Sequence, residues 1–304
     1  ANDTQVFESA LTPDGSGGGS TSTDGSFEIN TGNDALEAFE IQGANGEWID
    51  VTDGGTVQGE YGALLITIAE GGNYAWTYTI SDNTLDHTDT GTTDGDSDRG
   101  IADNVLDPFQ IRVTDDDGDT SPEANLTLKV ADDGPSLQIV ADDATVVEGE
   151  TVGGDWNRVA GADGGVVKVV VGGTEYNLGE AIPTGKGTLT VNSDGSWSFS
   201  ANDDLDNDLP QSVSFTLQIT DGDLDVASDN LTITITDGAG PTLGDATSVA
   251  LAVDEDDLPA GSDTAKEPLS NSGTLTFTAG SDAIDSIVFG DTSGIALAGI
   301  ENPA

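Results

Sequence analysis

The feature that most constrains the fold of this chain is a long unit that occurs twice. The segment from Phe109 to Pro135 reads FQIRVTDDDGDTSPEANLTLKVADDGP, and the segment from Phe215 to Pro241 reads FTLQITDGDLDVASDNLTITITDGAGP. Each contains an apolar strand pattern, an Asp-rich turn, a second strand pattern and an acidic linker that ends in Pro. The two units start 106 residues apart (215 − 109 = 106). The sequence therefore predicts an array of similar modules.

Two further pairs of segments extend this repeat. The sequence WTYTISDNTLD at 76–86 matches WSFSANDDLD at 197–206, and GSFEINTGNDAL at 25–36 matches GTLTFTAGSDAI at 273–284. A repeat of this length is close to one immunoglobulin-like β-sandwich. We therefore expect module boundaries at the acidic Gly-Pro linkers. The expected divisions are 1–135, 136–241 and 242–304, the last being a truncated third module or half of a split domain.

Local patterns predict strands and turns, and none of them indicates a convincing helix. Period-two or apolar runs that predict strands lie at 166–171, 188–191, 196–200, 213–220 and 231–236. Asn-Ser-Asp-Gly at 192–195 predicts a hairpin, with a type I′ turn at Asp-Gly. The expected fold class is all-β, with tandem immunoglobulin-like β-sandwich modules stiffened by calcium and a long inserted loop in the first module.

The net negative charge of the chain must be neutralised if the chain is to fold compactly. It has 57 Asp plus Glu against 7 Lys plus Arg, a formal net charge of −50, and no Cys. A compact state with this charge repels itself, so the chain is either disordered or neutralised by bound cations. Alternating β-branched and aromatic residues favour folded modules. Because carboxylates are hard oxygen ligands and disulfides are impossible, we expect several calcium ions to supply the rigidity.

The candidate metal ligands are acidic residues in turns and linkers. The turns Asp115–Asp119 and Asp221–Asp225 place carboxylates at alternate positions, where they can converge on one ion. The alternative is a solvated acidic hairpin. Linker carboxylates of successive modules can share ions and lock a joint, although an acidic linker can also be flexible. The predicted ligands are Asp86, Asp94, Asp96, Asp98, Asp115, Asp117, Asp119, Asp132, Asp133, Glu148, Asp203, Asp206, Asp221, Asp223, Asp225, Asp237, Asp254 and Glu255.

One insertion distinguishes the first module from the second. Asp86 and Asp115 are 29 residues apart, whereas the matching Asp206 and Asp221 are 15 apart, so the first module has about 14 extra residues. They fall in a Gly/Asp/Thr-rich loop at 87–104. Inserted loops on rigid sandwiches often carry recognition, and the alternative is a loop with a structural duty alone. The candidate ligand-binding residues are His87, Asp89, Thr92, Asp94, Asp96 and Arg99.

Several functional classes fit this sequence poorly. With one His, no Cys and no GxSxG-like turn, nucleophilic catalysis lacks its parts, so we do not expect an enzyme. The acidic surface would repel nucleic acid. The sequence has no apolar run of 18 residues and no leader pattern, which predicts neither membrane insertion nor an export signal within this segment. We expect a monomeric, rod-shaped piece of a longer polypeptide.

The repeated unit resembles the repeat domains of type I secreted RTX adhesins, which are giant calcium-dependent surface proteins of Gram-negative bacteria. The resemblance rests on the strand, Asp-rich turn, strand and DDGP linker, preceded by WTYT and LDH in the first module and by DGSWSFSA and DDLD in the second. It covers nearly the whole chain. The GGxGxDxUx export repeats and the xGTGND face of an ice-binding solenoid are missing.

The resemblance implies a secreted segment at the cell surface that mediates adhesion or biofilm formation. In that family, extender modules hold a ligand-binding module away from the cell, and the pattern of the first module is similar to repeats that recognise a peptide C-terminus with the help of calcium. The implied partner is a protein, peptide or glycan on a host or neighbouring cell, with the peptide favoured. The alternative is a purely structural spacer without a ligand site.

Overall fold

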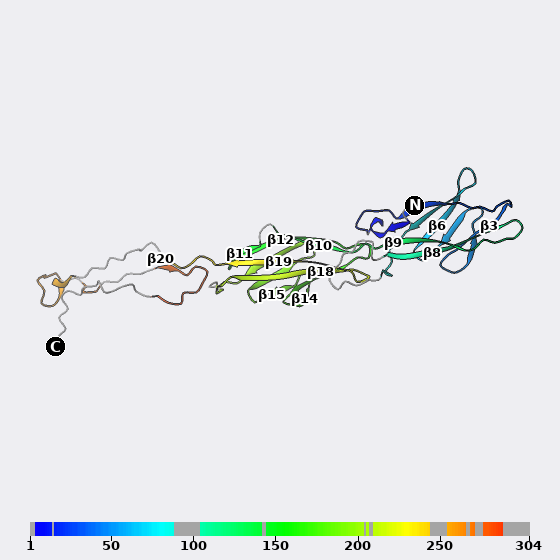
Figure 1. Ribbon diagram of the computed structural model, residues 1–304. Helices are drawn as coiled ribbons and strands as arrows, with labels where there is room; N and C mark the ends of the chain where they lie inside the picture. The colour runs from blue at the N-terminus through cyan, green and yellow to red at the C-terminus, as the bar shows by residue number, and fades with distance from the viewer. Residues whose placement is uncertain are drawn as a thin grey trace.

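The protein is built almost entirely of β-strands. A computed structural model describes residues 4–13, 15–87, 104–141, 144–203, 205–206, 209–243, 254–265, 268–270 and 276–287. Two separate hydrophobic cores lie between Val6 and Val130 and between Ile139 and Ile235. Figure 1 shows the two sandwiches following one another along one line. The expected fold class of tandem immunoglobulin-like β-sandwiches is confirmed.

The first sandwich, here called module 1, has one five-stranded and one four-stranded sheet. Their strand orders are β1-β9-β8-β3-β4 and β2-β7-β6-β5. Edge strand β1 runs parallel to β9, whereas the other pairs are antiparallel. The bounds are β1 (Gln5–Phe7), β2 (Ser22–Phe27), β3 (Leu36–Gln42), β4 (Trp48–Asp50), β5 (Gly55–Gln58), β6 (Gly62–Ile68), β7 (Tyr74–Ile80), β8 (Asn104–Asp115) and β9 (Ala124–Ala131).

The second sandwich, module 2, has two five-stranded sheets. Their orders are β11-β19-β18-β13-β14 and β10-β12-β17-β16-β15, and β11 runs parallel to β19 as β1 does to β9. The bounds are β10 (Ser136–Val140), β11 (Thr145–Val147), β12 (Thr151–Val159), β13 (Val166–Val171), β14 (Thr174–Asn177), β15 (Ala181–Pro183), β16 (Gly187–Val191), β17 (Ser196–Ala201), β18 (Gln211–Thr220) and β19 (Val226–Thr236).

Alternation of side chains explains these strands. In β7 the side chains of Tyr74, Trp76, Tyr78 and Ile80 are buried, while the residues between them lie nearer the surface. A period of two places one face of each strand on the core. The five runs that predicted strands in module 2 correspond to β13, β16, β17, β18 and β19, so those predictions are confirmed.

The hairpin predicted at 192–195 forms between β16 and β17, but its turn type is different. Asn192 N donates to Ser196 O at 2.8 Å, and Gly195 N donates to Asn192 O at 3.3 Å. Gly195 has φ +92°, whereas Asp194 is not in the left-handed region. A type I′ turn needs positive φ at both central residues, so the prediction of that type was wrong. One glycine in the left-handed region closes the hairpin instead.

Beyond module 2, the structure describes two short strands and a 3₁₀ turn. Strand β20 (Thr242–Leu243) pairs with β21 (Phe277–Thr278), and η2 spans Glu255–Asp257. The other 3₁₀ turn, η1 (Glu8–Ala10), directly follows β1. Among the described residues, no helix is long and apolar enough to cross a membrane.

A buried carboxylate holds two strands of module 1 together. Asp107 on β8 is 1% exposed, and its Oδ2 accepts a hydrogen bond of 2.7 Å from the Tyr78 hydroxyl on β7. The same carboxylate also accepts from three backbone N–H groups. Oδ1 accepts from Glu60 at 3.0 Å, and Oδ2 accepts from Tyr61 and Gly62 at 3.1 and 3.3 Å. Module 2 has Phe199 and Val213 at the matching positions, so the same place is apolar there.

We predict that Asp107→Ala lowers the free energy of unfolding of module 1 by about 3 kcal/mol, because four donors lose a charged acceptor. The double variant Tyr78→Phe with Asp107→Val should recover part of that loss, since it installs the apolar pair of module 2. Hydrogen exchange at the β7 amides in increasing urea measures module 1 separately. Equal exchange in Asp107→Ala and the unmodified chain would contradict this role.

Candidate metal centre at the joint between modules

The Asp-rich turn of module 2 gathers three carboxylates. Asp225 N donates to Asp221 Oδ1 at 2.7 Å, and Asp221 N donates to Asp225 O at 3.1 Å, so the turn closes on itself. One carboxylate oxygen from each of Asp221, Asp223 and Asp225 lies within 4.8 Å of the other two. Two oxygens on opposite sides of a calcium ion are also about 4.8 Å apart, because each lies about 2.4 Å from the ion.

This turn contains an unusual backbone conformation. Among the described residues, Leu224 is the one non-glycine residue with positive φ, at +85°, and its side chain is 69% exposed. A bulky residue in the left-handed region is strained. The matching turn of module 1 has Gly118 there, with φ +93°, and Asp119 N donates to Asp115 Oδ1 at 2.8 Å. Both turns therefore keep the geometry that brings alternate carboxylates together.

The linker after module 1 carries two aspartates with different surroundings. Asp133 is 1% exposed, and both of its oxygens accept hydrogen bonds from the backbone and hydroxyl of Ser16. Asp132 is 3% exposed, and its Oδ1 accepts from Asp133 N at 2.6 Å. Its Oδ2 is buried without a hydrogen-bond donor. Asp133 thus anchors the linker, and Asp132 faces the joint.

Asp132 meets two carboxylates of the following module. They belong to Asp163, in the loop between β12 and β13, and to Asp223. One oxygen from each of the three carboxylates lies within 4.8 Å of the other two. Asp163 Oδ2 and both oxygens of Asp223 are also buried without a donor. Buried acceptors normally have partners. A cation in this space would satisfy them all, and it would join module 1 to module 2.

The electrostatics of the cluster follow from this crowding. Burial raises the pKa of Asp132 to about 8, with the negative charge of Asp223 adding to the effect. Burial also raises the pKa of Asp221 to about 9, with further contributions from Asp223 and Asp225. The pKa of Asp163 rises to about 6 through burial, against a hydrogen bond from Asn83. These carboxylates require either protons or a cation to share the space.

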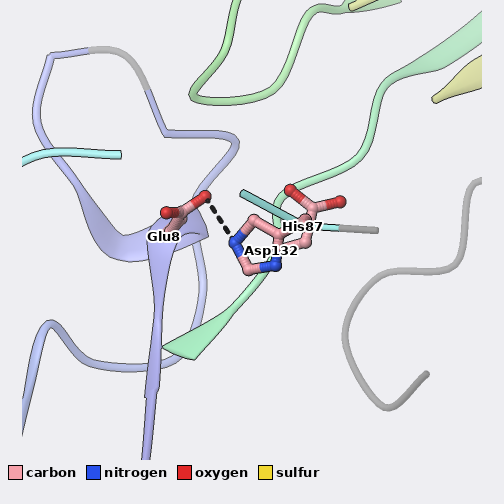
Figure 2. Close-up of side chains that lie close together, drawn as sticks. All are labelled: Glu8, His87 and Asp132. Atoms are coloured by element: carbon pink, nitrogen blue, oxygen red, sulfur yellow. Dashed lines mark ion pairs between the residues drawn. The ribbon is translucent and has the colours of Figure 1, made fainter. Parts of the chain in front are cut away.

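A second group lies on the module 1 side of the same joint. Figure 2 shows Glu8, His87 and Asp132 side by side, with an ion pair of 3.4 Å between His87 Nε2 and Glu8 Oε2. Glu8 Oε1 accepts from Thr84 N at 2.7 Å. Glu8 therefore holds the loop that follows β7 against the linker. That loop also contacts module 2, because Asn83 donates to Asp163.

The joint after module 2 repeats this arrangement. Glu148, Asp237 and Asp282 form another group with oxygens within 4.8 Å of one another. Glu148 accepts from Leu205 N and Gly238 N, both at 3.1 Å. Burial raises the pKa of Glu148, but hydrogen bonds from Ser281 and from these two N–H groups outweigh it and hold the pKa below its usual value.

The two joints use equivalent residues. Glu8 directly follows β1, and Glu148 directly follows β11, the two parallel edge strands. Asp132 directly follows β9 and Asp237 directly follows β19, although the 106-residue repeat aligns Asp132 with Gly238. Asp163 and Asp282 each stand two residues after a glycine with positive φ, Gly161 and Gly280. Added Cβ atoms there would lie 2.0 Å from Asp133 O and from Ala239 O, so these glycines permit close contact with the linker.

The structure brings together some of the predicted ligands. Asp132, Asp221, Asp223 and Asp225 meet at the first joint, and Glu148 meets Asp237 at the second. Asp115 and Asp117 form a further group with Asp34. Sequence reasoning missed Glu8, Asp34, Asp163 and Asp282. The signal that could have found three of them is the Gly-x-Asp sequence at 32–34, 161–163 and 280–282, although the same pattern also occurs at 153–155 and 261–263.

Other predicted residues lie elsewhere. Asp86, Asp119, Asp203 and Asp206 are exposed, and Asp254 caps η2 by accepting from Asp256 N at 3.3 Å, next to Glu255. His87 is 5% exposed and lies inside the joint. The predicted residues Asp89, Thr92, Asp94, Asp96, Asp98 and Arg99 lie outside the described residues. Their roles stay predictions.

Residues 132–236 match the family described as the bacterial Ig domain. The matched range runs from the joint aspartate to the last residue of β19, so it covers module 2. The match supports a bacterial surface protein of the immunoglobulin-like kind. No curated protein matches the chain.

Several solved structures match the chain at low identity. The fibronectin(III)-like modules of CbhA from Clostridium thermocellum are 11% identical, cover 78% of this chain and 90% of their own, and give a TM-score of 0.24. The titin domains z1z2, in complex with telethonin, are 12% identical over 71% and 87%, with a TM-score of 0.35. The D00-D0 domain of intimin is 8% identical over 78% and 96%, with a TM-score of 0.24. The likeness at these TM-scores carries no argument about function.

We predict that the cation-free chain becomes less stable as pH rises from about 5 to about 9. Asp132 and Asp221 have folded-state pKa values of about 8 and about 9, whereas an unfolded Asp titrates near about 3.9. Between these values the folded state binds more protons than the unfolded state, so the free energy of unfolding falls with pH. Thermal melts in chelator measure it.

The matched control for this pH dependence is the double variant Asp132→Asn with Asp221→Asn. It removes the two carboxyl groups with the most raised pKa values, so its melting temperature should depend less on pH than that of the unmodified chain. A chelated chain whose melting temperature increases from about pH 5 to about pH 8 would contradict the assignment.

Proposed function

We propose that this chain is a calcium-dependent segment of a bacterial cell-surface adhesin, in which calcium ions at the joints fix successive modules in line. The observation that carries the proposal is the group formed by Asp132 of one module and Asp163 and Asp223 of the next. Three carboxylates with unsatisfied oxygens, contributed by two modules, form a site that is complete only when the modules are aligned. An ion bound there stabilises that alignment.

Calcium suits these residues better than other cations. The groups at the first joint offer carboxylate oxygens from Asp132, Asp163, Asp221, Asp223 and Asp225, and calcium takes six to eight oxygen ligands in flexible geometry. Magnesium demands a tighter octahedron and keeps more of its water. Soft metals favour thiolates, and the sequence has no Cys. Outside the cell, calcium reaches the concentration that extracellular modules with weak sites require.

The charge of the whole chain supports the same proposal. At −50 the modules repel one another and themselves. The electrostatic repulsion is strongest where carboxylates are buried, which is at the joint. Bound calcium offsets this repulsion there, whereas the exposed Asp and Glu side chains stay hydrated. The match to the bacterial Ig domain supports a location at the bacterial surface.

Binding of a ligand by module 1 is the finer part of the proposal. The inserted loop at 87–104 begins at His87, which is held in the joint by Glu8. Its first residue is therefore fixed at the calcium-binding end of the module. A peptide C-terminus is the favoured ligand and a sugar the second. The alternative is a spacer without ligand, which is favoured by the equivalent joints of the two modules.

We predict that calcium raises the melting temperature of the chain by at least about 4 °C at a concentration well above its dissociation constant, because the ion binds the folded state alone. Magnesium should have a smaller effect. Asp132→Asn should lose at least half of the calcium effect. The control Glu175→Gln removes one negative charge from exposed β14, outside these groups, and should keep the effect. An unchanged melt in excess chelator would refute the proposal.

We predict that shortening residues 88–101 to the loop length of module 2 abolishes binding of peptides with a free C-terminal carboxylate, while the calcium-dependent melt stays. Titration of immobilised peptides against both proteins measures this, with amidated peptides and monosaccharides as controls. Equal binding by the shortened chain would reject the loop as the site. Binding by neither protein would favour the spacer.

A further inference from the structure

Module 2 contains a strand without a counterpart among the described residues of module 1. Four strands of the sheet β10-β12-β17-β16-β15 match the sheet β2-β7-β6-β5, and the strand left over is β10. The match is fixed by register, because Gly25 pairs with Trp76 as Gly154 pairs with Trp197. Among the described residues, no strand therefore pairs with Ser26–Asn30 on the side that matches the pairing of β10 with β12.

In module 2, β10 closes the space between the two sheets. It runs antiparallel to β12, with Ser136 opposite Val159 and Val140 opposite Asp155. It also packs on β18 and β19 of the other sheet. Ile139 belongs to the core, and its N–H donates to Asp229 Oδ2 at 2.8 Å.

The equivalent space in module 1 is a groove of about 840 Å³. Gly25 to Asn30 form one wall, and they are the counterparts of Gly154 to Val159, the stretch of β12 that holds β10. The opposite wall comes from β8 and β9, at Ile111–Val113 and Ala124–Leu126. Trp76 and Phe39 also line it, so the groove has apolar surface for alternate side chains of an added strand.

The chain leads into this groove. Residues 1–8 read ANDTQVFE and residues 141–148 read ADDATVVE. Thr4 O accepts from Lys129 N at 2.8 Å, as Ala144 O accepts from Thr234 N at 2.7 Å. Thr4 lines the groove. By this match, a strand that corresponds to β10 would have to be joined directly ahead of Ala1.

The far end of the groove has the surroundings of a joint. A smaller hollow lined by Asn30, Val113, Asp115 and Asp119 shares lining residues with the groove. The group of Asp34, Asp115 and Asp117 lies at this end and matches Asp163, Asp221 and Asp223, beside which Ser136 enters module 2. A strand that enters the groove here passes the same acidic end as β10 does.

We propose that this groove seats an extended strand of the pattern of β10, joined in sequence directly ahead of Ala1 and paired antiparallel with Ser26–Asn30. Its apolar side chains at alternate positions fill the space between the sheets. Its backbone pairs with the backbone of Ser26–Asn30, at the end of β2. Attachment ahead of Ala1 favours this strand over a free peptide, since it is held near its seat at high effective concentration.

The test extends the full chain by five residues, Ser-Leu-Gln-Ile-Val, the sequence of β10, placed directly before Ala1. The matched control carries Ser-Asn-Gln-Asn-Val, which has the same length and charge without the two large apolar side chains. Melting temperature and hydrogen exchange at the amides of Ser26–Asn30 are measured in excess calcium. Under these conditions the chain is folded whether or not the joint binds calcium. A failure of the strand proposal can therefore be distinguished from a failure of the calcium proposal.

The first extension should raise the melting temperature of module 1 by at least about 4 °C and slow exchange at Ser26–Asn30 at least tenfold. The control extension should change neither. Equal behaviour of the two extensions would overturn the proposal. The free peptide Ser-Leu-Gln-Ile-Val, added in equimolar amount, should give no protection; protection by the free peptide without protection by the extension would overturn attachment ahead of Ala1 and assign the groove to a separate chain.

Discussion

The repulsion among buried carboxylates at the joint is the constraint on which the arrangement of modules depends. Each sandwich has its own apolar core and needs no neighbour to bury it. Between the cores, Asp132 and Asp223 are brought together by two separately folded modules. Like charges in a poorly hydrated space are stable only with protons or a cation. The relative placement of the modules is therefore tied to what neutralises these groups.

Much of the fold could be predicted, because strand periodicity and turn residues are local signals. The five strands predicted in module 2 and the Asp-rich turns were visible in the sequence. The joint was only partly visible, because Glu8 lies far from Asp132 in sequence and is placed by the parallel pairing of β1 with β9. The sequence also could not show that Asp132 and Asp133 have different roles, since Asp133 anchors the linker through its hydrogen bond from Ser16.

Comparison of the two modules separates what the fold requires from what it tolerates. The apolar pair Phe199 and Val213 replaces the hydrogen-bonded pair Tyr78 and Asp107, so that place accepts either chemistry if all polar atoms are satisfied. The Asp-rich turn is stricter. Leu224 adopts the strained conformation that Gly118 adopts freely, which indicates that the turn is held by more than local preference.

The parallel pairing of β11 with β19 has a mechanical consequence. The chain enters module 2 at β10, continues into β11 and leaves after β19, and β11 and β19 are neighbours in one sheet that run in the same direction. A pull on the two ends of the module slides one strand along the other, so the hydrogen bonds between them are loaded together, in shear. They cannot open one at a time like a zipper. A module built in this way resists tension through this short strand pair, in which three residues of β11 pair with three of β19.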